Sequence, residues 1–147
     1  MGTVRQHRGM TPRHLSPGRI GSINESVPYT DFTDGGGAAG TYQMKSAIPV
    51  NARVLGCIII PEVGFTGDTS AAITVGDGSD VDRYNTGTPS VFTTATGQTT
   101  IAAGAVSGTP LHVAEIFPTI TITSGSDWGL VTAGRIYVEI HFIEAGG

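Results

Sequence analysis

Two stretches near the end of the chain alternate strictly between apolar and other side chains. In residues 134–143 one face carries Ile136, Val138, Ile140 and Phe142, and the other carries Tyr137, Glu139 and His141. In residues 119–123, Ile120 and Ile122 alternate with three threonines. A period of two places one face on a core and the other on solvent or a partner. Both stretches are therefore predicted to be antiparallel β-strands.

The rest of the chain has the composition of a β protein. Twenty Thr, 14 Ile and 12 Val make up 46 of the 147 residues, against only 4 Leu, 5 Glu, 3 Gln and 1 Lys. β-branched side chains lose rotamer freedom in a helix and fit a pleated sheet. This composition excludes a helical bundle and an α/β fold with long crossover helices.

Eight strands are predicted, at residues 41–50, 53–61, 70–75, 90–96, 99–103, 111–117, 119–123 and 134–143. Their number and spacing are typical of an all-β antiparallel β-sandwich, of jelly-roll type. The continuous apolar run at residues 54–60 predicts a central strand that is buried on both faces. Cys57 lies in this run and is predicted to be a buried, inert thiol, as suits a chain made in a reducing cytosol.

Residues 1–40 differ from the sandwich predicted for residues 41–147. They contain three prolines and a Gly-rich run at residues 34–40, and their apolar residues follow no period. They are interpreted as an extended arm with a flexible hinge. Its scattered apolar side chains could dock into grooves of a neighbouring subunit. Those named as contacts are Ile20, Ile23, Tyr29 and Phe32.

The charge is divided between arm and body. Residues 1–22 contain four arginines (Arg5, Arg8, Arg13 and Arg19) and no acid, whereas residues 23–147 contain four basic residues and all 12 acids. A basic arm on an acidic body suggests an acidic partner. An acidic protein surface is preferred to nucleic acid, because four arginines offer few phosphate contacts; a solvated tail is the alternative. No apolar stretch approaches the length of about 20 residues that spans a membrane, and no signal peptide is expected.

One turn gathers acidic side chains. Residues 76–84 read Gly-Asp-Gly-Ser-Asp-Val-Asp-Arg-Tyr, with acids at Asp77, Asp80 and Asp82. Asp and Ser side chains that cap turn N–H groups, with Arg83 pairing an Asp, explain this composition. A calcium site is a weaker alternative, because the spacing does not match an EF-hand loop, and a contact with a partner is another.

No residue pattern points to catalysis. The histidines at positions 7, 14, 112 and 141 lack zinc-site spacing, and no nucleophile elbow, phosphate loop or dinucleotide fingerprint occurs. We therefore expect no enzyme and no cofactor. Trp128, the only tryptophan, lies in a Gly-rich loop. It is predicted to pack over the end of the sandwich or into a subunit contact, with a stacked sugar as the alternative.

Three segments of the sequence resemble small structural proteins of tailed bacteriophages. They are residues 40–57 around Gly40-Thr-Tyr-Gln-Met, residues 67–84 around Thr74-Val-Gly-Asp-Gly-Ser-Asp, and residues 120–140 around Thr132-Ala-Gly-Arg-Ile-Tyr. The likeness covers residues 40–145 and is greatest to capsid cement, or decoration, proteins. The basic arm lies outside it.

The resemblance implies a structural virion protein on the outside of the capsid, assembled in the cytoplasm of the host bacterium. It implies a homotrimer that bridges capsomers, with the major capsid protein as partner. The arm would then dock on neighbouring capsid subunits. The alternatives are a head-fibre or tail module that binds host glycans through Trp128, Tyr84 and nearby Asp residues, and a head–tail connector component.

Overall fold

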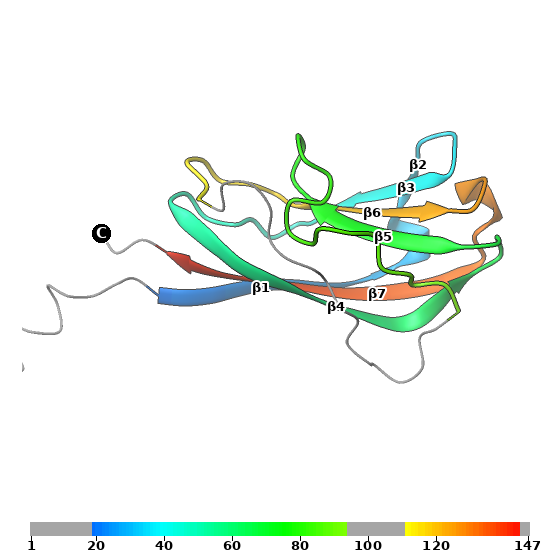
Figure 1. Ribbon diagram of the computed structural model, residues 1–147, viewed down its shortest axis with the longest axis horizontal. Coiled ribbons are helices and arrows are strands. Elements are labelled where there is room, and N and C mark those ends of the chain that lie inside the picture. Colours follow the sequence, from blue (N-terminus) through cyan, green and yellow to red (C-terminus); the bar gives the residue numbers. More distant parts are fainter. Residues whose placement is uncertain (1–18, 94–110, 145–147) are drawn as a thin grey trace, which may run out of the picture.

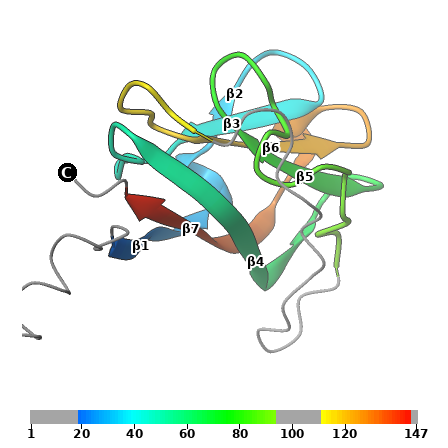
Figure 2. The same cartoon turned by 60° about the vertical axis from the view of Figure 1, so that its left-hand side comes forward.

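The computed structural model describes residues 19–93 and 111–144. They form two antiparallel sheets that pack face to face (Figures 1 and 2). One sheet has three strands in the order β1 (Arg19–Pro28), β7 (Ala133–Glu144) and β4 (Ala52–Thr66). The other has four, in the order β2 (Thr33–Asp34), β3 (Ala39–Gln43), β6 (Thr119–Ser124) and β5 (Ala71–Gly76). The 3-10 turns η1 (Tyr29–Asp31) and η2 (Trp128–Leu130) are the helical elements of this part.

The core lies between the two sheets, where the alternation of the sequence places it. Ile136, Val138 and Ile140 of β7 are completely buried, and so are Ile120 and Ile122 of β6. Their neighbours along each strand stay at least partly exposed until the strand ends. The predicted all-β fold with antiparallel sheets is thus confirmed. No helix in the described part is long and apolar enough to cross a membrane.

The jelly-roll order stays a prediction, because part of the predicted strand set lies outside the described residues. Residues 99–103, and residues 94–96 of the predicted strand 90–96, fall in the segment 94–110. The segments predicted as strands at 90–96 and 111–117 contribute single bridges where they are described, such as Phe65 with Phe92 and Arg53 with Leu111. Residues 44–51 form no regular strand, although Ile48 pairs with Ile116.

The predicted boundary at residue 40 is wrong for residues 19–40. β1 pairs with β7 over its whole length, from Arg19 opposite Glu144 to Pro28 opposite Arg135. Glu25 of β1 accepts hydrogen bonds from the Tyr42 hydroxyl (2.7 Å) and from the backbone N–H groups of Lys45 (2.6 Å) and Ser46 (3.0 Å). These bonds fix β1 to β3 of the opposite sheet and to the loop after it. Residues 1–18 of the expected arm lie outside the described residues.

The position of β4 also differs from the prediction. The apolar run at residues 54–60 was expected in a central strand, but β4 lies at the edge of the described three-stranded sheet, where β7 is its one neighbouring strand. Its inner face is buried through Val54 and Ile59. Its outer face carries Leu55 and Val63, which are 53% and 47% exposed. The strand is also irregular, with register shifts at Val54/Gly56 and Pro61/Val63.

Candidate interaction surfaces

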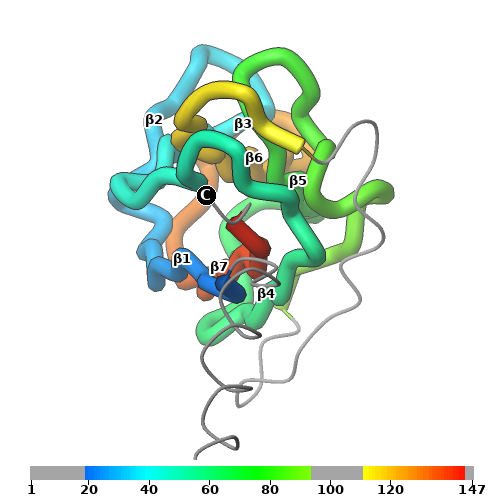
Figure 3. Tube along the Cα trace, turned by 90° about the vertical axis from the view of Figure 1, so that its left-hand side faces the viewer, coloured from blue at the N-terminus to red at the C-terminus, as the bar shows by residue number. Residues whose placement is uncertain are grey.

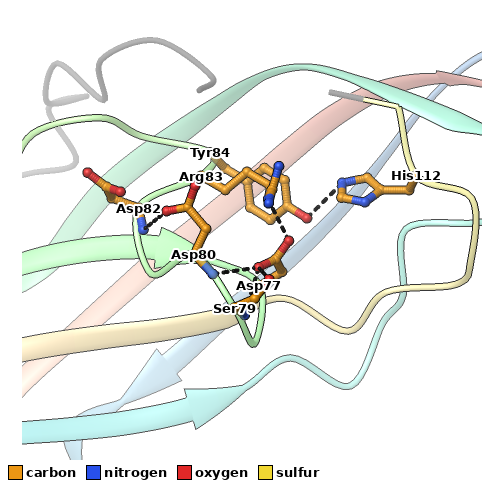
Figure 4. A network of polar contacts seen from close by, with 7 residues as sticks. All are labelled: Asp77, Ser79, Asp80, Asp82, Arg83, Tyr84 and His112. Carbon is orange, nitrogen blue, oxygen red and sulfur yellow. Dashed lines mark hydrogen bonds and ion pairs between the residues drawn. The ribbon is translucent and has the colours of Figure 1, made fainter. Parts of the chain in front are cut away.

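The acidic turn after β5 is held together by its own side chains (Figure 4). Asp77 Oδ1 accepts hydrogen bonds from the backbone N–H groups of Ser79 (2.9 Å) and Asp80 (2.8 Å), and Oδ2 lies 2.5 Å from Nε of Arg83. Burial alone would raise the pKa of Asp77, but these donors and the Arg83 charge hold it below its ordinary value. The predicted capping role is confirmed for this residue.

Behind the turn, two side chains meet in the interior. Tyr84 is fully buried, and its hydroxyl lies 2.9 Å from Nε2 of His112, which is 7% exposed (Figure 4). Burial raises the pKa of the Tyr84 hydroxyl and lowers the pKa of His112. The backbone of His112 is also fixed, because it pairs with Asn51 and Ala52. Spacing could not reveal this pair, since the two residues are 28 positions apart.

The arrangement offers no described metal site. Both carboxylate oxygens of Asp77 are engaged within the turn, Oδ1 by backbone N–H groups and Oδ2 by Arg83. Asp80 Oδ1 accepts from the backbone N–H of Asp82 at 3.4 Å. Within residues 19–93 and 111–144, no group of three His, Cys, Asp or Glu side chains is placed to hold a metal ion.

Of the arginines expected to contact a partner, Arg5, Arg8 and Arg13 lie outside the described residues. Arg19 begins β1; its side chain is 85% exposed and lies 3.8 Å from the Glu144 carboxylate. Ile20 follows with 76% of its surface exposed. Both are accessible, so their expected role as contacts stays a prediction.

Phe32 and Trp128, which were expected to contact a neighbouring subunit, are buried. Phe32 and Trp128 are 7% and 5% exposed, and their rings pack on each other and on Phe65 at centroid distances of 5.4–6.3 Å. Ile23 and Tyr29 are partly buried against the same core. Phe32 and Trp128 are therefore core residues of this chain, which corrects the expectation that they anchor a neighbouring subunit.

Figure 3 faces the end of the sandwich where β1 begins and β7 ends. Several exposed apolar side chains belong to this end. The loop 44–51 and the segment 111–118 run side by side there, because Ile48 pairs with Ile116 and Asn51 donates to the carbonyl of His112. The exposed side chains of these two segments are Val50 (52%), Leu111 (38%), Val113 (81%) and Phe117 (41%). With Ile20 they form what we call the apolar end. All of these residues except Ile20 lie in segments that the sequence predicts to be strands, and no sequence pattern marks them as a surface.

The outer face of the three-stranded sheet carries a polar network on β7. The carboxylate of Glu139 accepts from the Tyr137 hydroxyl at 2.9 Å and lies 2.8 Å from Nε2 of His141. These partners, His141 first, hold the pKa of Glu139 below its ordinary value. Nearby, Arg135 donates to the hydroxyl of Ser26 at 3.3 Å, and Ser26 donates to Glu62. These bonds link the side chains of this half of the face, and Glu62 stays partly exposed.

Comparison with known proteins identifies the fold. No family model and no curated protein matches the chain. Among solved structures, a chain of the cyanophage Pam1 capsid asymmetric unit is similar over 89% of both chains, with a TM-score of 0.60 and 17% identity. The chain thus shares the fold of that capsid chain. Weaker similarities are to the capsid of Helicobacter pylori bacteriophage KHP30 (TM-score 0.45, 10% identity, 85% and 93% covered) and to the disulfide-linked pili of Bacillus endospore appendages (0.41, 16%, 89% and 96%).

Proposed function

We propose that this chain is a structural protein of a phage virion, which binds the outside of the capsid and stabilises it by bridging capsomers. The observation that carries the proposal is the shared fold with a chain of a phage capsid asymmetric unit over 89% of both chains. The sequence resemblance to cement proteins agrees with it. The major capsid protein is the proposed partner, and the resemblance adds a homotrimeric state.

The proposed arm is shorter than residues 1–40. Residues 19–40 belong to the sandwich, so the arm comprises residues 1–18, with Arg5, Arg8 and Arg13 and no acid. It joins the body at Arg19, at the apolar end. A basic arm and an apolar surface at one end suit docking on one neighbour. When one of these two surfaces is bound, it holds the other close to its target. The two together therefore bind more tightly than either alone.

The two aromatic residues named for the host-recognition alternative are buried. Trp128 is 5% exposed and Tyr84 is fully buried, so neither ring can stack on a sugar without unfolding its surroundings. No described feature favours a connector over a capsid-binding protein, and we propose neither alternative.

The copy number in purified virions tests the capsid role. A protein that bridges capsomers is present in numbers comparable to the capsomers of the whole shell, whereas a connector is present once per vertex or tail. Quantitative mass spectrometry against the major capsid protein measures the ratio. A ratio that corresponds to a single ring would contradict the proposal.

Deletion of residues 1–18 tests the arm. Because the cut ends before β1, the shortened chain should fold and keep its melting temperature but bind purified capsids more weakly. A matched full-length variant with Arg5, Arg8 and Arg13 changed to Gln separates charge from length. Capsid binding that survives both changes would exclude the arm as a docking element.

A further inference from the structure

The outer face of β4 carries an apolar stripe that the described part of the chain leaves open. The register pairs Glu139 of β7 with Ile58, and Arg135 with Val63. Directly opposite residues of an antiparallel pair share a face. Ile58, Ile60 and Val63 therefore lie on the outer face, together with Leu55, which follows the buried Val54. We call Leu55, Ile58, Ile60 and Val63 the aliphatic stripe.

This stripe is unusual for the face on which it lies. The solvent side of an antiparallel sheet is normally polar, and β1 follows that rule with Ser22, Asn24 and Ser26. The stripe instead extends over nine residue positions of β4, about 26 Å at 3.3 Å per residue. Leu55 and Val63 at its ends are about half exposed, and Ile58 and Ile60 between them are partly exposed. A strand with a sequence typical of burial on both faces is thus covered by the described residues on only one face.

The charges at the two ends of the stripe suit one kind of partner. Arg53 precedes the stripe and is exposed in the outer-face row with Ile143 and Leu111. Glu62 lies at the other end, and its carboxylate reaches over the outer face to the hydroxyl of Ser26. An apolar stripe with a base at one end and an acid at the other is complementary to its own antiparallel copy. Such a surface suits an isologous contact about a two-fold axis.

We propose that the aliphatic stripe binds the same stripe of a second copy of this chain. The two β4 strands lie antiparallel, with Ile58 near the two-fold axis and Arg53 of each copy directed towards Glu62 of the other. The contact goes beyond the proposed function, because it needs no capsid. It uses neither the arm nor the side chains of the apolar end, although Arg53 lies beside Leu111 of that end.

Light scattering on the purified full chain tests the contact by charge reversal. The wild type should have twice the mass of the form found for R53E, whether or not a three-fold contact also exists. E62R should behave like R53E, and the double variant R53E/E62R should regain the wild-type mass, because it restores both pairs with reversed signs. N24D, on the same sheet face but outside the stripe, is the control and should not change the mass. A monomeric wild type, or a double variant no better than the single ones, would overturn the proposal.

Cross-linking locates the axis of the contact. In a C57A background, a short bis-maleimide should link I58C into a dimer, because each Ile58 faces its own copy across two sheets about 10 Å apart, a distance too long for a direct disulfide. V63C should not, since Val63 of one copy lies towards the Leu55 end of the other. The double variant L55C/V63C should cross-link again. Equal reactivity of I58C and V63C would contradict the two-fold arrangement, and circular dichroism shows whether each variant is folded.

Discussion

The Tyr84 hydroxyl and Nε2 of His112 lie 2.9 Å apart in the interior and join the turn after β5 to the segment that precedes β6. Tyr84 is fully buried and His112 nearly so. The backbone N–H of His112 donates to the carbonyl of Ala52, at the start of β4. One polar pair therefore connects three parts of the chain that are distant in sequence.

The substitution Y84F should destabilise the protein. It removes the hydroxyl, keeps the ring and leaves Nε2 of His112 buried without this partner, at a cost of about 1–3 kcal/mol. Urea unfolding followed by circular dichroism measures the change. Y137F removes a hydrogen bond to Glu139 on the partly exposed outer face and should cost less. Equal losses in the two variants would contradict the structural importance of the buried pair.

The stability should fall as the pH decreases through the range in which histidine titrates. Burial lowers the pKa of His112 below its ordinary value of about 6.5, so the folded state binds fewer protons than the unfolded state there. The stabilisation is complete above pH 6.5 and is lost as the pH falls from there towards the lowered folded pKa. The melting temperature of the wild type should therefore decrease between pH 7.5 and 5.5.

The variant H112N isolates the contribution of His112. The pKa values of Asp77 and Glu139 are lowered, so the stability that these carboxylates give is lost only as the pH falls through the ordinary carboxyl range near pH 4. His141 is present in both proteins. The pH dependence from 7.5 to 5.5 should therefore be flatter in H112N than in the wild type. Parallel curves would show that His112 does not become protonated on unfolding.

Strands with one buried face were predictable from the sequence. β6 and β7 alternate without interruption, and their predicted ends lie within one residue of the observed ones. β1 was missed because the inner face of its ten residues includes a charge. Glu25 lies there because it accepts hydrogen bonds from Tyr42, Lys45 and Ser46, and no local pattern reveals such distant donors.

The expectations about what covers Trp128 and β4 share one difficulty. Hydrophobicity indicates that a side chain will be covered but not by which chain. Trp128 was expected at the end of the sandwich or at a subunit contact, and it is covered by Phe32 and Phe65 of the same chain. The run at residues 54–60 indicated cover on both faces of β4, but the register places one face outside the core. The arrangement of the strands in space decides whether an apolar side chain is covered by its own chain, and the sequence pattern does not give that arrangement.

The substitution D77A should unfold the acidic turn locally and destabilise the whole protein. It removes the acceptor for the N–H groups of Ser79 and Asp80 and leaves the Arg83 guanidinium, which is largely buried, without this carboxylate. Loss of a charged acceptor in such a place costs about 2–3 kcal/mol. D82A on the same turn is the matched control and should cost less than about 0.5 kcal/mol, as most surface substitutions do. Thermal unfolding of both variants distinguishes a specific cap from a general requirement for acids in this turn.

The substitution G40A should disturb the aromatic core, because β3 passes directly over Trp128. A Cβ atom at position 40 would lie 2.3 Å from Cε2 of the indole and 2.4 Å from Cδ2, so the ring or the strand has to move. Overpacking of this kind costs about 1–3 kcal/mol. G37A, where a Cβ atom meets nothing within 4 Å, should leave the stability nearly unchanged. Fluorescence adds a direct readout, since Trp128 is the only tryptophan and its buried emission should shift to the red in G40A but not in G37A. An unshifted spectrum with unchanged stability would show that the indole does not pack against β3.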